Sequence, residues 1–193
     1  MTRIAGLLGS GLALALLAGC GSMSSLNPFA DKSPKPPCPR LSVPADAASV
    51  IRFRPGPGED LTDVLVDAKV ADVKFSCEHD IDKETRDGEL AFELTMLIEA
   101  NRGPADTGRQ ASLEYFVTLL DKDRNVLQKK SFPVKVEFPG NFTRTTVTDM
   151  PVKMTVPLSS GQTGRDFLIY TGLQLSQTEL DYNIRKRKMT SGR

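Results

Sequence analysis

Apolar and polar residues alternate along most of the chain beyond residue 60, and this period-two pattern constrains the fold more than any other feature of the sequence. Successive side chains of a strand point to opposite faces of its sheet, so each alternating run predicts a strand with one buried face. The clearest run spans residues 90–98, with Glu93 and Thr95 among its polar positions. Its apolar positions are Leu90, Phe92, Leu94, Met96 and Ile98.

A hairpin is predicted in the middle of the chain. Residues 113–119 and 132–138 are two alternating runs, and the polar segment 121–125 between them is typical of a tight turn. Further runs follow at 152–156 and 167–175, separated by clusters of Gly, Pro, Asn and Ser. The residues expected in the core include Phe92, Leu94, Tyr115, Val117, Val134 and Ile169.

The apolar parity changes within the segment 64–77. Even-numbered positions are apolar up to residue 70, and odd-numbered positions are apolar from residue 73. A one-residue slip moves every side chain to the other face of a sheet. The sequence therefore predicts either one long strand with a bulge near Ala71-Asp72 or two strands that meet there.

These runs amount to about seven strands with no amphipathic helix between them. The pattern predicts an all-β fold, an antiparallel β-sandwich. A small barrel gives the same alternation and stays open as an alternative.

A short helix is expected at the end of the chain. Ser176 and Glu179 have the spacing of a capping box, and Leu175 and Leu180 have that of a hydrophobic staple. The helix should run out into the basic residues 185–188, because cations suit the carboxyl end of a helix.

The first twenty residues indicate export. A basic start at Arg3 precedes an apolar stretch, residues 4–16, that is too short to span a bilayer. The stretch closes with Leu17-Ala-Gly-Cys20, which resembles a bacterial lipobox. The resemblance implies that residues 1–19 are a lipoprotein signal peptide and that Cys20 carries the lipid. Several acyl chains, at ~0.8 kcal/mol per buried methylene, would make the attachment effectively permanent.

The segments after Cys20 differ in composition. Residues 20–39 are rich in Ser, Pro, Gly and Lys without an apolar period, which predicts a lipidated tether. The sandwich domain is expected at 40–185, followed by a mobile basic tail at 186–193. Lys and Arg number 25 and Asp and Glu 24, so the overall charge does not point to nucleic acid.

Cys38 and Cys77 are expected to form a disulfide. An export signal places them in an oxidising compartment, and two cysteines allow one pairing. Two unpaired thiols, or a metal pair with His79, are the alternatives. A metal site needs three or four convergent ligands, so we expect none here.

The sequence offers no catalytic centre and no cofactor motif, because phosphate loops, dinucleotide fingerprints, HExxH and GxSxG do not occur in it. A hydrolase would have to recruit His79, the only histidine. Carboxylates alternate at Asp80, Asp82 and Glu84, but an EF-hand loop would need Gly at the position of Thr85. A solvated acidic turn is the preferred interpretation.

Residues from about 38 to about 185 resemble a group of uncharacterised envelope lipoproteins of Gram-negative bacteria, of the alphaproteobacterial type. The resemblance rests on short motifs: Cys38-Pro39, Phe53-Arg-Pro-Gly56, Asp60-Leu-Thr-Asp-Val64, Cys77, Arg102-Gly-Pro-Ala105, Tyr115-Phe-Val117, Gly172-Leu-Gln-Leu175 and Leu180-Asp-Tyr-Asn-Ile184. It implies membrane attachment and no assigned activity. An immunoglobulin-like or fibronectin-III-like sandwich would suit the group, although this chain lacks the core tryptophan such domains often contain.

We therefore expect a non-catalytic lipoprotein that is bound to the membrane through the lipid on Cys20 and docks onto another envelope protein. Gly21, by resemblance to sorted lipoproteins, implies the periplasmic side of the outer membrane. The candidate surfaces are the turn 102–104, the acidic run 59–93 and the basic tail. A small-ligand or cation-binding envelope lipoprotein, using a cavity between the sheets or the turn 80–84, is the alternative.

Overall fold

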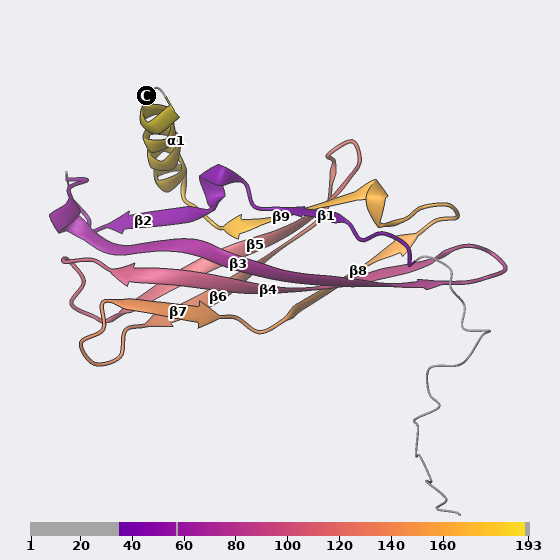
Figure 1. Cartoon of the computed structure of the whole chain (residues 1–193). Coiled ribbons are helices and arrows are strands. Elements are labelled where there is room, and N and C mark those ends of the chain that lie inside the picture. Colours follow the sequence, from indigo (N-terminus) through magenta and orange to yellow (C-terminus); the bar gives the residue numbers. More distant parts are fainter. Residues whose placement is uncertain (1–34, 57, 192–193) are drawn as a thin grey trace, which may run out of the picture. The chain divides into compact units, whose positions relative to one another are not determined.

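Figure 1 shows the computed structural model, which describes residues 35–56 and 58–191. The predictions for the signal peptide, for Cys20 and for most of the tether lie outside these residues. The described elements are β1 (Arg40–Ser42), η2 (Ala45–Ala47), β2 (Ser49–Phe53), η3 (Leu61–Asp63), β3 (Val64–Ile81), β4 (Gly88–Arg102), β5 (Gln110–Asp121), β6 (Val126–Glu137), β7 (Arg144–Thr148), β8 (Val152–Leu158), η4 (Gly164–Asp166), β9 (Phe167–Leu173) and α1 (Gln177–Ser191).

The strands form two sheets. One has the order β1-β9-β5-β6, and the other has the order β2-β3-β4-β7, with β8 also paired to β4. The β1–β9 pair is parallel, and the other pairs described are antiparallel. The apolar rows of both sheets share one core. This sandwich-like arrangement confirms the predicted all-β fold class with one helix at its end.

The core follows the alternation that the sequence displays. Along β4 every second side chain is buried, from Leu90 to Ala100. All six residues predicted for the core are at most 4% exposed. Period-two burial on both sheets is what closes a sandwich, because each sheet then offers one apolar face.

β3 is one strand of 18 residues with an irregularity in the middle. Its register against β4 shifts between Val70 and Asp72, so the bulge interpretation is confirmed over that of two strands. The bulge absorbs one extra residue and returns the following apolar positions to the inner face. Val73, Phe75 and Cys77 pack against the core as a result.

The disulfide between Cys38 and Cys77 is present, with 5.8 Å between the two α-carbons. It joins the segment before β1, in the first sheet, to β3, in the second. The bridge therefore ties the two sheets together through a covalent bond. Closing a loop of this length stabilises a fold by about 4 kcal/mol in the chain-entropy treatment.

The C-terminal helix begins as predicted and continues further than predicted. The Ser176 hydroxyl accepts from the Glu179 amide at 3.3 Å, and the Glu179 carboxylate accepts from the Ser176 amide at 2.7 Å, which completes the capping box. The helix then runs to Ser191, so it includes the basic residues 185–188, into which it was expected to run out, and the first residues of the predicted tail 186–193. Arg and Lys are good helix formers, which explains the extension.

Candidate functional site

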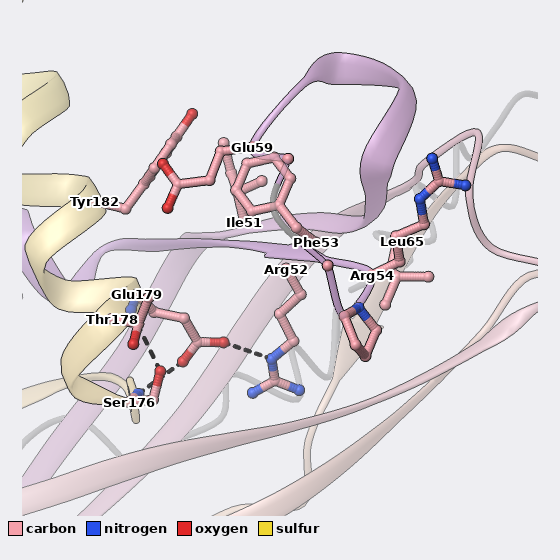
Figure 2. Close-up of a pocket in the computed structure, with 13 residues that line it drawn as sticks. Ile51, Arg52, Phe53, Arg54, Glu59, Leu65, Ser176, Thr178, Glu179 and Tyr182 are labelled. Atoms are coloured by element: carbon pink, nitrogen blue, oxygen red, sulfur yellow. Dashed lines mark hydrogen bonds and ion pairs between the residues drawn. The ribbon is translucent and has the colours of Figure 1, made fainter.

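A groove of about 430 Å³ lies between β2, the first turns of α1 and the segment that follows β2 (Figure 2). Ile51, Phe53, Leu65 and Tyr182 supply its apolar surface. The rings of Phe53 and Tyr182 meet edge to face, with 5.4 Å between their centroids. The groove thus has an aromatic pair from two segments that are far apart in the sequence.

The pleat of β2 explains why these side chains face the groove. Val50 is buried in the core at 1% exposure, so its neighbour Ile51 points to the opposite face, under α1. The register of β2 against β3 shifts where Arg52 pairs with Val66 and Phe53 with Val64. The shift leaves Leu65 without a partner on β2, and this side chain lines the groove.

Asn183 positions α1 over this part of the fold. It is 8% exposed, and its side-chain amide donates to the Asp46 carbonyl at 2.9 Å and to the Ser49 carbonyl at 2.7 Å. These two carbonyls flank the chain where it passes from η2 into β2. No sequence pattern marks Asn183, and Leu180, whose staple spacing predicted the contact of α1, is only half-buried.

Three ion pairs stand around the groove. Arg52 pairs with Glu179 at 2.8 Å (Figure 2), Arg54 with Asp63 at 2.5 Å and Arg185 with Glu59 at 2.9 Å. Each pair joins groups from different elements or loops. Consequently every arginine at this rim already has a carboxylate partner within the domain.

Glu179 belongs both to the helix cap and to the rim. Desolvation raises the pKa of its carboxyl, but hydrogen bonds from the Ser176 amide and the Arg52 guanidinium outweigh that effect. The pKa of Glu179 therefore lies below its ordinary value, and the carboxylate is charged at neutral pH.

The predicted disulfide lies far from the groove, whereas Glu59 of the acidic run belongs to the groove lining. Cys77 is thirteen residues further along β3 than Val64, which pairs with Phe53 at the groove. At the rise of a strand this separation is roughly 40 Å. His79 and the turn after β3 lie further still in the same direction along the chain. The described chain begins at the end of the domain opposite to α1 (Figure 1).

The acidic turn after β3 uses its best-placed carboxylate internally. Asp82 accepts hydrogen bonds from the Thr85 amide, the Glu84 amide and the Thr85 hydroxyl, which hold its pKa below the usual range. In the part of the chain that the structure describes, no group of three or more His, Cys, Asp or Glu side chains is placed to hold a metal ion.

His79 lies at the end of β3 nearest to this turn. Its Nε2 atom is buried and has no hydrogen-bond partner among the described residues. Desolvation lowers the pKa of the imidazole below its ordinary value, so the side chain is neutral at pH 7.

The turn 102–104 serves the packing of the fold. The Gly103 amide donates to the Leu65 carbonyl at 2.9 Å, and a β-carbon at Gly103 would approach the Val64 carbonyl oxygen to 2.0 Å. Only glycine allows this approach of two backbones. A structural requirement therefore accounts for the glycine of this motif.

The comparisons with known proteins name no family for the chain. No protein-family model matches it, and no curated protein is similar to it. Among solved structures, it is similar to the variable (V) domain of the AgI/II polypeptide BspA of Streptococcus agalactiae, at 12% identity. The match covers 67% of this chain and 73% of that one, but its TM-score of 0.19 supports no conclusion about fold or function.

Within residues 35–56 and 58–191, no helix combines the length and the apolar character that crossing a bilayer requires.

Proposed function

We propose that the chain is a non-catalytic lipoprotein of the cell envelope that is bound to the outer membrane, on its periplasmic side, through a lipid on Cys20. In this proposal its sandwich domain docks onto another envelope protein. The groove beside α1 receives an uncharged, apolar segment of that partner.

The observation that carries the proposal is the combination of apolar walls and paired charges at the groove. Aromatic side chains such as Phe53 and Tyr182 dominate the energetics of protein interfaces when a partner buries them. The arginines at the rim are already neutralised by Glu179, Asp63 and Glu59. A charged segment of the partner would meet arginines that are already paired with carboxylates. An apolar segment would instead bury the rings of Phe53 and Tyr182.

The position of the groove also supports this function. It lies roughly 40 Å along β3 from the disulfide that fixes the start of the described chain. A lipid on Cys20 would attach the protein through the segment that leads into Lys35. The groove would then be presented away from the bilayer, where a periplasmic partner can reach it.

An immunoglobulin-like or fibronectin-III-like identity is the finer part of the fold proposal. Two facing sheets of four and five strands around one core support it. The consecutive pairing of β2, β3 and β4 differs from the Greek-key order of those domains, so the proposal is a variant of the sandwich.

A small-ligand carrier is the second candidate. A volume of about 430 Å³ falls within the range of roughly 300–1,000 Å³ that is usual for ligand pockets. The two candidates predict different adducts at the groove, and one experiment separates them.

The test places a photo-crosslinking amino acid at Thr178, which lines the groove, in the full chain in its own bacterium. The matched control carries it at Ser131, an exposed residue of β6. The proposal expects one discrete protein adduct from position 178 and none from position 131. A small-molecule adduct at 178 would favour the ligand carrier, and equal adducts from both positions would contradict docking at the groove.

A further inference from the structure

A second hollow, of about 460 Å³, lies beside the segment that leads into β1. Its lining contains three cationic side chains, Arg40, Lys122 and Arg165, together with Pro37, Cys38 and Leu168. We propose that this basic pocket binds the phosphate of anionic lipid headgroups and so holds the tether end of the domain against the membrane surface. The lipid source rests on the proposed anchorage, whereas the phosphate chemistry rests on the pocket alone.

The sheet order brings the three cations together. Arg40 opens β1 and lies opposite Leu168 of β9, and Asp121 at the end of β5 lies opposite Phe167. The ends of three adjacent strands therefore meet at one place. Lys122 follows β5 directly, and Arg165 belongs to η4 directly before β9.

The wall of the pocket is held by close and covalent contacts. The disulfide fixes Cys38 to β3. A β-carbon at Gly164 would lie 2.2 Å from the Pro37 carbonyl oxygen, so the segment before β1 packs directly on η4. η4 itself is closed by a capping box between Thr163 and Asp166. The cations thus project from a fixed frame, which lowers the cost of binding an anion.

The three cations have no ion-pair partner within residues 35–56 and 58–191, in contrast to the arginines at the groove. Two of the neighbouring carboxylates accept hydrogen bonds from other groups: Asp121 accepts from the Asn125 side chain and amide, and Asp166 accepts from the Thr163 amide at 2.8 Å. A phosphate offers several oxygen acceptors to guanidinium and ammonium groups.

The residues close in sequence to the pocket lining carry a net positive charge. Within two residues of the lining side chains, five cations outnumber three carboxylates. The cations are Lys35, Arg40, Lys122, Arg124 and Arg165, and the carboxylates are Asp121, Asp123 and Asp166. An anionic surface would therefore attract the cations of the pocket, by about 1 kcal/mol for each cation that reaches it, while the acidic turn after β3 at the same end of the domain would be repelled.

Lipid headgroups are the source that the location favours. Pro37 and Cys38, two residues of the pocket wall, belong to the segment that leads towards Cys20, and Lys35 is only fifteen residues after that cysteine. A lipidated Cys20 would hold this end of the domain near the bilayer. The pocket would then face a dense layer of phosphates, and its cations would orient the domain.

The test uses the full chain reconstituted in vesicles of phosphatidylcholine, with or without phosphatidylglycerol, that contain a nitroxide-labelled headgroup lipid. The chain has no tryptophan, so a single introduced tryptophan reports without background. Leu127→Trp reports on the pocket end, because Leu127 is exposed and lines a hollow with Phe167. Leu61→Trp, at an exposed position beside the groove end, is the control reporter.

We expect the labelled headgroups to quench the tryptophan fluorescence of Leu127→Trp at least twofold more when phosphatidylglycerol is present. The quenching of the tryptophan fluorescence of Leu61→Trp should stay unchanged. The triple variant Arg40→Gln/Lys122→Gln/Arg165→Gln should lose the increase. The control Lys130→Gln/Lys186→Gln/Lys188→Gln removes three other exposed cations and should keep it. Inorganic phosphate should abolish the increase at a concentration where chloride of equal ionic strength does not.

Three results would overturn the proposal. The increase could survive in the pocket variant, or disappear in the control variant, or respond equally to phosphate and chloride. Protection of the protein from thermal unfolding by inorganic phosphate, with no response to phosphatidylglycerol, would contradict the lipid source. Attachment to vesicles is measured separately, so a failure of the lipid anchor is distinguished from a failure of the pocket.

Discussion

Asn183 stabilises the interface between α1 and the sandwich through a pair of hydrogen bonds. Both donors of its amide are used, and both acceptors are backbone carbonyls on either side of the turn into β2. A helix that carries few buried residues needs such a contact to keep one orientation. Since Tyr182 directly precedes Asn183 on α1, the orientation of the helix also sets one wall of the groove.

Replacing Asn183 with leucine should therefore destabilise the domain. The substitution keeps the approximate volume but removes the donor of two partly buried carbonyls, at a cost of about 1–3 kcal/mol. Urea unfolding followed by circular dichroism measures the change. Lys188→Leu, on the exposed end of the same helix, is the control and should change the free energy of unfolding by less than about 0.5 kcal/mol. Equal effects of the two substitutions would show that the amide does not fix the helix.

Glu179 makes a pH-dependent contribution. Its pKa is lower in the folded protein than the ordinary value of 4.5. Because the folded-state pKa is depressed, the stabilisation is complete above about pH 4.5 and is lost as the pH falls through the folded-state pKa.

The wild-type chain should accordingly lose more stability between pH 6 and pH 3 than Glu179→Gln does. The melting temperature measured across this range gives the comparison. Asp181→Asn, an exposed change on the same helix, should follow the wild-type curve. Parallel curves for the wild type and Glu179→Gln would contradict the assignment of this carboxylate to the cap and the Arg52 pair.

At the scale of elements, the strands that the sequence predicted are those with a full inward row. β4, β5, β8 and β9 each bury alternate apolar side chains, and the parity change in β3 marked its bulge. β7 escaped prediction because its sequence Arg-Thr-Thr-Val-Thr contains one apolar residue. Tertiary pairing with β4 makes it a strand.

The groove could not be read from the sequence for a related reason. Its apolar residues come from β2, β3 and α1, and no local pattern connects them. Leu65 faces the groove through an irregular pairing of β2 with β3, which depends on the register of two strands. The capping box was readable because both of its partners lie within four residues of each other.

In the whole domain, the disulfide and the groove lie at opposite ends of β3. Cys38 and Cys77 join the sheets at the end where the described chain begins. The groove and α1 lie at the other end of β3. In the proposed function the first end faces the membrane and the second faces a partner.

Removing the disulfide should loosen the first end and leave the groove intact. Cys38→Ser/Cys77→Ser should lower the free energy of unfolding by about 2–4 kcal/mol, because the unfolded chain regains the freedom of the closed loop. Urea unfolding of the variant, and of the wild type with and without a reductant, measures this effect. A reduced wild type as stable as the oxidised one would contradict it.

The lipid anchor is tested through Cys20. Cys20→Ser should yield a chain that is neither lipidated nor processed at that position, because the thiol is the acceptor of the lipid. Metabolic labelling with a fatty-acid analogue, followed by gel electrophoresis, reads the outcome. Cys77→Ser is the control and should retain the label, whereas label retained by Cys20→Ser would refute the anchor.

The yield of the crosslinked adduct at position 178 measures whether the groove beside α1 docks a partner protein. Phe53→Ala and Tyr182→Ala each remove one ring of the aromatic pair. Either substitution should reduce the yield at least tenfold, whereas Phe142→Ala, which removes an exposed ring from the loop before β7, should leave it unchanged. An adduct that persists at full yield without both rings of the groove would contradict the claim.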